Sequence, residues 1–150
     1  MLFKTHIMLG FLIALFGIDY FAPENQILFA FVVILGAAFP DIDHPKSKIG
    51  KKFRPISYLF EHRGFFHSFL AIAGFSFLIY GVTGSVLYTT AFLLGYSSHI
   101  LADALSTQGI MPFHPLLKFR LKGVFNTGSI YEYILLLCLV GLSVWKLFSM

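Results

Sequence analysis

Long apolar runs dominate the sequence, and short polar stretches interrupt them. The first run covers residues 3–21, roughly the 20 residues that a helix needs to cross the hydrocarbon core of a bilayer. A second covers residues 23–39 and must end there, because Pro40 disfavours helical geometry in the residue before it. Further apolar helices are expected at residues 65–83, 85–105 and 130–148. The pattern predicts an all-α, polytopic membrane bundle of about five transmembrane helices in one domain, residues 1–150.

Composition supports a membrane protein. Hydrophobic residues make up 57% of the chain and charged residues 12%, and the mean hydropathy is +0.81. A soluble domain of 150 residues has too little interior to bury that much apolar surface. A cleaved signal peptide would need small residues before its cleavage site, but Tyr20 and Phe21 precede Ala22. We therefore expect the first helix to be retained.

The basic residues indicate how the bundle is oriented. In the five-helix topology every Lys and Arg except Lys146 falls on the side of the N-terminus. Because cytoplasmic loops carry the excess of Lys and Arg, the N-terminus is predicted to face the cytoplasm across a cell or inner membrane. The residues on that side are Lys4, Lys46, Lys48, Lys51, Lys52, Arg54, Arg63, Lys118, Arg120 and Lys122.

Histidines and carboxylates gather on the same side, although only Lys and Arg were used to orient the chain. Carboxylate and neutral imidazole are ligands that suit a divalent metal ion, and a charge without a partner at the edge of hydrocarbon is costly. The sequence therefore predicts a metal site at the cytoplasmic end of the bundle. Asp19 and Glu24 fall on the opposite side and are expected to be solvated interfacial charges. The candidate metal ligands are His6, Asp41, Asp43, His44, His62, His67, His99, Asp103 and Glu132.

His99 and Asp103 form the most specific local pair. Residues four apart lie one above the other on a helix, so the two can share a metal ion or hydrogen-bond each other. Small residues on the same helix would let a neighbouring helix approach closely. These are Ala91, Gly95, Ser98 and Ala102.

Asp41 and Asp43 are the candidate catalytic carboxylates. They flank Ile42 just beyond a helix end, so an extended segment would point both to one side. Either could orient or deprotonate a water molecule, with a slight preference for Asp43. Arg63 is a third catalytic candidate, because it could contact a phosphate group. The alternative is that it only reflects the excess of basic residues on the cytoplasmic side.

Several spaced motifs together resemble the YdjM-type membrane-bound metal-dependent hydrolases over about residues 5–132. That family is in turn similar to the zinc-dependent phospholipases C and the single-strand zinc nucleases. The resemblance implies an all-α enzyme with two or three zinc ions, in which His99 and Asp103 match a His and an Asp four apart. It makes His6, Asp41 or Asp43, and His67 counterparts of the other ligands, but Gly128 replaces the His expected four residues before Glu132. The motifs are Thr5-His6, residues 41–47, His62-Arg63-Gly64, His67-Ser68, residues 95–99, Asp103, Thr107 and Gly109.

The predicted function is a membrane-embedded, metal-dependent hydrolase that cleaves a phosphate ester of a lipid or another anionic substrate. Loops 46–63 and 111–122 mix basic with aromatic residues, as expected for segments that lie on an anionic leaflet. The alternative is that the basic residues only set the orientation of the chain in the membrane. A divalent metal transporter, or a metal-binding protein without hydrolase activity, is the alternative, but transporter ligands are expected near mid-membrane. The carboxylates beside the His residues argue against a haem carrier. No nucleic-acid module and no protease motif is present, and the oligomeric state stays open.

Overall fold

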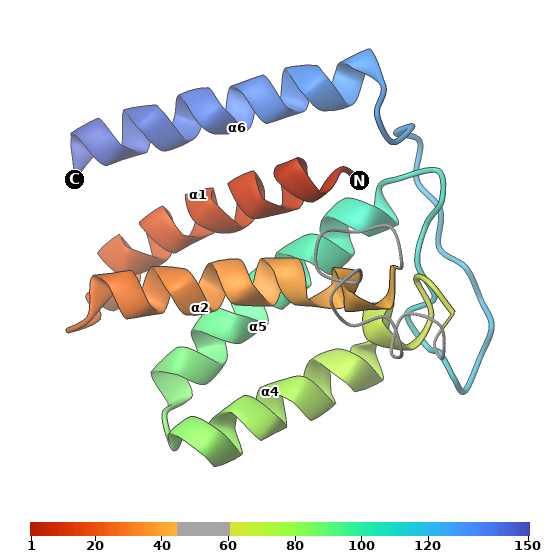
Figure 1. Cartoon of the computed structure of the whole chain (residues 1–150), viewed down its shortest axis with the longest axis horizontal. Helices are drawn as coiled ribbons and strands as arrows, with labels where there is room; N and C mark the ends of the chain where they lie inside the picture. Colours follow the sequence, from red (N-terminus) through yellow and green to blue (C-terminus); the bar gives the residue numbers. More distant parts are fainter. Residues whose placement is uncertain (45–60) are drawn as a thin grey trace.

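Five α-helices run alternately up and down through the part of the chain that the computed structural model describes, residues 1–44 and 61–150 (Figure 1). Two short 3-10 helices, η1 (Phe39–Asp43) and η2 (Phe65–His67), precede and follow the stretch that is left out. The predicted all-α class is confirmed. The α-helices are α1 (Phe3–Phe21), α2 (Gln26–Ala38), α4 (Phe69–Thr83), α5 (Val86–Ala104) and α6 (Ile130–Ser149).

Three of the helical segments are long and apolar enough to cross a membrane. They are Phe3–Phe21, Gln26–Asp43, which joins α2 to η1, and Ile130–Ser149. Helix α4 is apolar, but its 15 residues are fewer than the roughly 20 that cross a bilayer as a helix. Helix α5 has 19 residues and contacts α1, α2 and α4, and its ionisable side chains, His99 and Asp103, are buried. The five-span topology stays a prediction, and three candidate spans are found within the described residues.

Two helices begin later than the sequence suggested, because a side-chain cap fixes the first residue of each. Asn25 accepts a hydrogen bond from the amide of Leu28 at 2.9 Å, and α2 starts after it and not at Pro23. Ser68 accepts one from the amide of Ala71 at 3.2 Å, and α4 starts after it and not at residue 65. A capping side chain satisfies an amide that has no partner within the helix, and so fixes where the helix begins.

Helices α2 and α5 approach each other closely. Both helices place a glycine at the crossing, and a Cβ atom on Gly95 would lie 1.9 Å from the carbonyl oxygen of Val33. A Cβ on Gly36 would lie 2.4 Å from the carbonyl oxygen of Phe92. Ala91 and Ala102 on α5 are also buried. The small residues expected on this helix therefore bring the two backbones together, as the sequence predicted.

Helix α6 packs against α1 and is held to it by polar contacts near both of its ends. Glu132, at the start of α6, accepts hydrogen bonds from the Thr5 hydroxyl at 3.0 Å and from the amide of Leu2. At the other end Lys146 forms an ion pair with Asp19. Asp19 was expected to be a solvated charge, and it is exposed. The sequence did not predict its partner, the buried ammonium of Lys146, which needs a counter-charge.

The tight α2–α5 crossing predicts opposite outcomes at two glycines. Gly95→Ala should lower stability by about 1–3 kcal/mol or more, because backbone atoms must move apart. Gly74→Ala on α4 is the matched control, since a Cβ there meets nothing within 4 Å. Alanine favours a helix, so that variant should be neutral or up to about 1 kcal/mol more stable. Thermal unfolding in detergent compares them, and equal midpoints would contradict the close crossing.

Candidate metal centre

Five segments meet at the end of the bundle where α1 begins and α5 ends (Figure 1). Helix α1 brings His6, α5 brings His99 and Asp103, and η1 follows α2 with Asp41 and Asp43. The fourth segment is η2, whose last residue is His67. The break between η2 and α4 keeps His67 at this end, and Tyr96 fixes η2 to α5 by donating a hydrogen bond to the carbonyl oxygen of Phe66 at 2.7 Å. The fifth is the start of α6, with Glu132.

The segment with the two aspartates is helical, not extended. Pro40 lies in the first turn of η1, where the missing amide hydrogen costs nothing, so the chain continues as a 3-10 helix. Neighbours two residues apart on such a helix diverge. Asp41 therefore lies near His99, with Oδ1 3.9 Å from Nε2, whereas Asp43 turns to His62 and His67. The expectation that both carboxylates point to one side is wrong.

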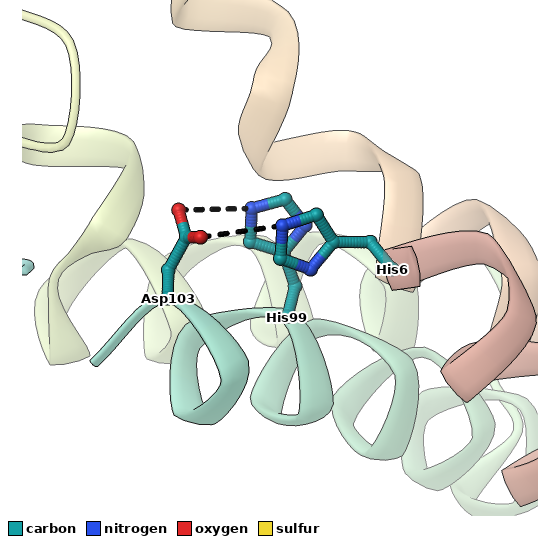
Figure 2. Close-up of side chains that lie close together, drawn as sticks. All are labelled: His6, His99 and Asp103. Atoms are coloured by element: carbon teal, nitrogen blue, oxygen red, sulfur yellow. Dashed lines mark ion pairs between the residues drawn. The ribbon is translucent and has the colours of Figure 1, made fainter. Parts of the chain in front are cut away.

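His6, His99 and Asp103 form the first group that could hold a metal ion (Figure 2). One ligand atom of each lies within 4.8 Å of the others, and all three side chains are buried. The imidazole rings of His6 and His99 stack with centroids 3.7 Å apart. Nε2 of His6 lies 3.3 Å from Oδ1 of Asp103, yet neither ring nitrogen of His6 makes a hydrogen bond within the described residues. A buried imidazole without hydrogen bonds is a group that a metal ion would satisfy.

Asp41, His67 and His99 form the second group, and His99 belongs to both. Nε2 of His67 lies 3.3 Å from Nε2 of His99 and 3.4 Å from Oδ2 of Asp103. Two nitrogen ligands about 2.1 Å from one tetrahedral zinc ion are themselves about 3.4 Å apart. The distances between these atoms therefore fit a shared cation.

The other ring nitrogens determine which atoms face the centre. Nδ1 of His99 lies 2.7 Å from the carbonyl oxygen of Ala37, so we assign its proton to that nitrogen. Nδ1 of His67 lies 3.1 Å from Oδ2 of Asp43 and is assigned in the same way. Both Nε2 atoms then point lone pairs at each other, which only a proton or a metal ion between them can stabilise.

In the metal-free protein, a proton on Nε2 of His67 removes the repulsion between the two lone pairs. Burial alone would lower the pKa of His67, but hydrogen bonds to Asp103 and Asp43 outweigh it and raise the pKa to about 9. A buried imidazolium between two carboxylates marks a place where positive charge is stabilised. A divalent ion would replace that proton, so the donor set fits a metal.

Asp43 lies behind His67 and outside both groups. Its carboxylate accepts from Nδ1 of His62 at 2.8 Å, from the amide of Arg63 at 3.1 Å and from His67. His44 stacks on His62 with ring centroids 4.2 Å apart. Burial, followed by the neighbouring His62, lowers the pKa of His44. The structure thus brings His44, His62 and Asp43 together as a second layer around His67.

Arg63 is buried and connects the centre to the loop after α5. Its guanidinium donates to Oδ1 of Asp103 at 3.0 Å, to the Ser106 hydroxyl at 2.6 Å and to the carbonyl oxygen of Gly109 at 3.2 Å. The amino group of Met1 also pairs with Asp103. The sequence singled out Arg63 and Gly109 but not Ser106, because a lone serine after a helix carries no distinctive signal.

Glu132 is buried at the same end but has other partners. Besides Leu2 and Thr5 it accepts a hydrogen bond from the amide of Gly128 at 2.6 Å, and it belongs to neither group. Thr5 immediately precedes His6, so these contacts fix the start of α1 where the first group needs it. The structure places Glu132 among the contacts that position His6.

Comparisons with known proteins agree with this picture. A family model described as "YdjM inner membrane protein" matches residues 1–149. "Uncharacterized protein YvsG" of Bacillus subtilis (strain 168) is 32% identical over 142 residues, which cover 89% of this chain and 86% of that protein. "Inner membrane protein YdjM" of Escherichia coli (strain K12) is 37% identical over 123 residues, which cover 75% of this chain and 63% of that protein.

A Shigella flexneri protein with the same name shows the same identity and coverage. No solved structure matches the chain. The family model covers nearly all of the sequence, including every candidate ligand named above. The chain thus belongs to the YdjM family of inner membrane proteins.

Proposed function

We propose that the protein is a membrane-embedded, metal-dependent hydrolase, and that its substrate is a phosphate ester of a lipid or another anionic molecule. One observation carries the proposal: the Nε2 atoms of His67 and His99 lie 3.3 Å apart, with Asp41 and Asp103 beside them, in a buried site. Such a set binds a divalent ion, zinc by its mixture of imidazole and carboxylate. The two groups share His99, which offers one free lone pair at Nε2 and so binds one ion. A second or a third ion would need ligands beyond these.

A bound divalent ion supplies the chemistry of hydrolysis by lowering the pKa of a water molecule and polarising a phosphoryl oxygen. The protein's own residues would prepare the site for it. The carbonyl oxygen of Ala37 and the carboxylate of Asp43 hold the rings of His99 and His67 with their Nε2 atoms inward. Arg63 holds Asp103 in place.

Asp41 and Asp43 are assigned different roles. The sequence slightly favoured Asp43 as the group that activates water. Three N–H donors occupy its oxygens, which favours a positioning role. Asp41 faces the Nε2 atoms and belongs to the second group, which favours it as the ligand or general base.

The substrate class rests on charge. Lys118 and Lys122 are exposed at the end of the bundle that carries the centre, and Arg120 there pairs with Glu61 at 3.3 Å. Exposed apolar side chains, Leu117 and Phe119, alternate with these bases. A segment of this kind suits an anionic leaflet and a phosphate-bearing substrate. The basic residues of loop 46–60 lie outside the described residues.

Metal transport is the alternative that the same ligands permit. A transporter needs ligands near the middle of the membrane and a path to both sides. The described ligands gather at one end of the helices, which favours hydrolysis. An assay of the protein in vesicles distinguishes the two functions. If the vesicles take up divalent ions and hydrolyse no phosphoester, the protein is a transporter and not a hydrolase.

The first prediction concerns the ligands. His99→Ala and Asp103→Ala should each lower metal affinity roughly a hundredfold or more, because each removes a donor from the groups. Metal analysis of the purified variants, beside their thermal stability, measures this. His114→Ala is the matched control, since His114 lies at the same end but in neither group. Full metal content in both ligand variants would make the pair structural.

The second prediction concerns catalysis. Asp43→Asn should lower kcat on a phosphoester by about a hundredfold or more with little change in KM, because a neutral amide has one acceptor oxygen for the three donors and cannot accept the proton of His67. Asp41→Asn should lose metal as well as turnover. Glu61→Gln makes the same chemical change at an exposed carboxylate and should keep both. Unchanged turnover in Asp43→Asn would refute this assignment.

The third prediction concerns orientation, since the centre is proposed to face the cytoplasm. With Cys138 replaced by serine, Thr83→Cys should react with an impermeant maleimide in intact cells. Gln108→Cys, at the end that carries the centre, should react only after permeabilisation. Both positions are exposed in the structure. Labelling of Gln108→Cys from outside would put the centre on the exterior face.

A further inference from the structure

A groove separates α1 from α6 between the polar contacts that join them. Phe3, Ile7 and Met8 line it from α1, and Leu136 and Val140 line it from α6. Its volume is about 370 Å³, which falls within the range of small-molecule sites. Few residues of α6 are buried, so most of its apolar side chains are open to an outside ligand. The walls formed by these residues suit an apolar ligand.

Lys4 is the one charged residue among those that line the groove. Its side chain is exposed, and within the described residues it forms no ion pair or hydrogen bond. An apolar groove with an unpaired ammonium at one end matches an amphiphile that has a hydrocarbon chain and a negatively charged head. Anionic phospholipids have that structure.

The position of Lys4 along the helix supports this ligand. Lys4 lies in the first turn of α1, at the end of a candidate membrane span, where headgroups are expected. Ile7 and Met8 lie one turn deeper, and Leu136 and Val140 follow one another by a turn on α6. The groove therefore runs from headgroup depth into hydrocarbon, in the direction that an acyl chain takes.

The groove is separate from the candidate metal centre. Lys4 and His6 are two residues apart on α1, about 200° around the helix axis, so they face nearly opposite ways. His6 points to Asp103, whereas Lys4 borders α6. A lipid bound here would act on the α1–α6 interface and would not be the substrate held by the centre.

We propose that the α1–α6 groove binds one anionic phospholipid, with its phosphate against the Lys4 ammonium and an acyl chain along Ile7, Met8, Leu136 and Val140. The bound lipid completes an interface whose polar contacts lie near its two ends, at Glu132 and at Lys146. This site is independent of the proposed hydrolase activity, so either can fail without the other.

The test reconstitutes the full chain in vesicles of phosphatidylethanolamine with or without phosphatidylglycerol. After extraction in mild detergent, native mass spectrometry counts the lipids retained per chain. The protein should retain one phosphatidylglycerol in preference to phosphatidylethanolamine, and phosphatidylglycerol should raise the temperature of unfolding. Lys4→Gln should weaken this retention roughly fivefold, as expected for one basic residue at a lipid surface. Lys4→Arg keeps the positive charge at the same position and should retain phosphatidylglycerol as well as the original chain does.

A second variant tests the apolar part of the site with Lys4 intact. Val140→Trp places a large ring in the groove and should reduce the retained lipid while α1 and α6 remain helical by circular dichroism. Equal retention by the original chain, Lys4→Gln and Val140→Trp would overturn the proposal. Retention without preference for phosphatidylglycerol would also overturn it, because that result indicates general annular lipid. A dimer in which a second copy of the chain covers α6 in place of lipid would overturn it as well.

Discussion

Two buried imidazoles that present their Nε2 atoms to each other at 3.3 Å impose the main constraint on this structure. The arrangement is unfavourable unless positive charge lies between them, and the carboxylates of Asp41 and Asp103 supply the balancing negative charge. A cluster like this lowers the free energy of the folded state only when it is complete, because each group left without its partner bears the cost of desolvation. The packing of this end of the bundle therefore depends on a complete cluster.

The rest of the bundle is arranged so that ligands from separate segments reach that point. Close contact between α2 and α5 at Gly36 and Gly95 sets the position of Ala37, whose carbonyl oxygen orients His99. The Tyr96 hydroxyl binds the backbone of η2 and so sets the position of His67. Backbone atoms and rigid helices thus orient the imidazoles, which leaves the ligands little freedom to lose when an ion binds.

Much of this could be predicted from the sequence, because apolar periodicity and charge bias are strong signals in membrane proteins. The helices, and the end at which the histidines gather, follow from those two signals. The unpredicted parts depend on local geometry that one-dimensional patterns do not carry. Pro40 sits inside a 3-10 turn, so Asp41 and Asp43 diverge and take different partners. Likewise, Ser68 follows η2 and caps α4, so His67 lies at the buried end of η2 and is not part of a longer helix.

The distribution of charge along α1 connects the centre to the membrane. Asp19 near one end pairs with Lys146, and Thr5 near the other binds Glu132, so α6 is aligned with α1 by polar contacts that tolerate little sliding. Sliding by one turn, about 5.4 Å, would break both contacts and leave buried charges without partners. Since His6 follows Thr5 directly, the contacts that align α6 also fix the depth of a candidate metal ligand in the bilayer. The candidate metal centre therefore depends on a helix that contributes no ligand to either group.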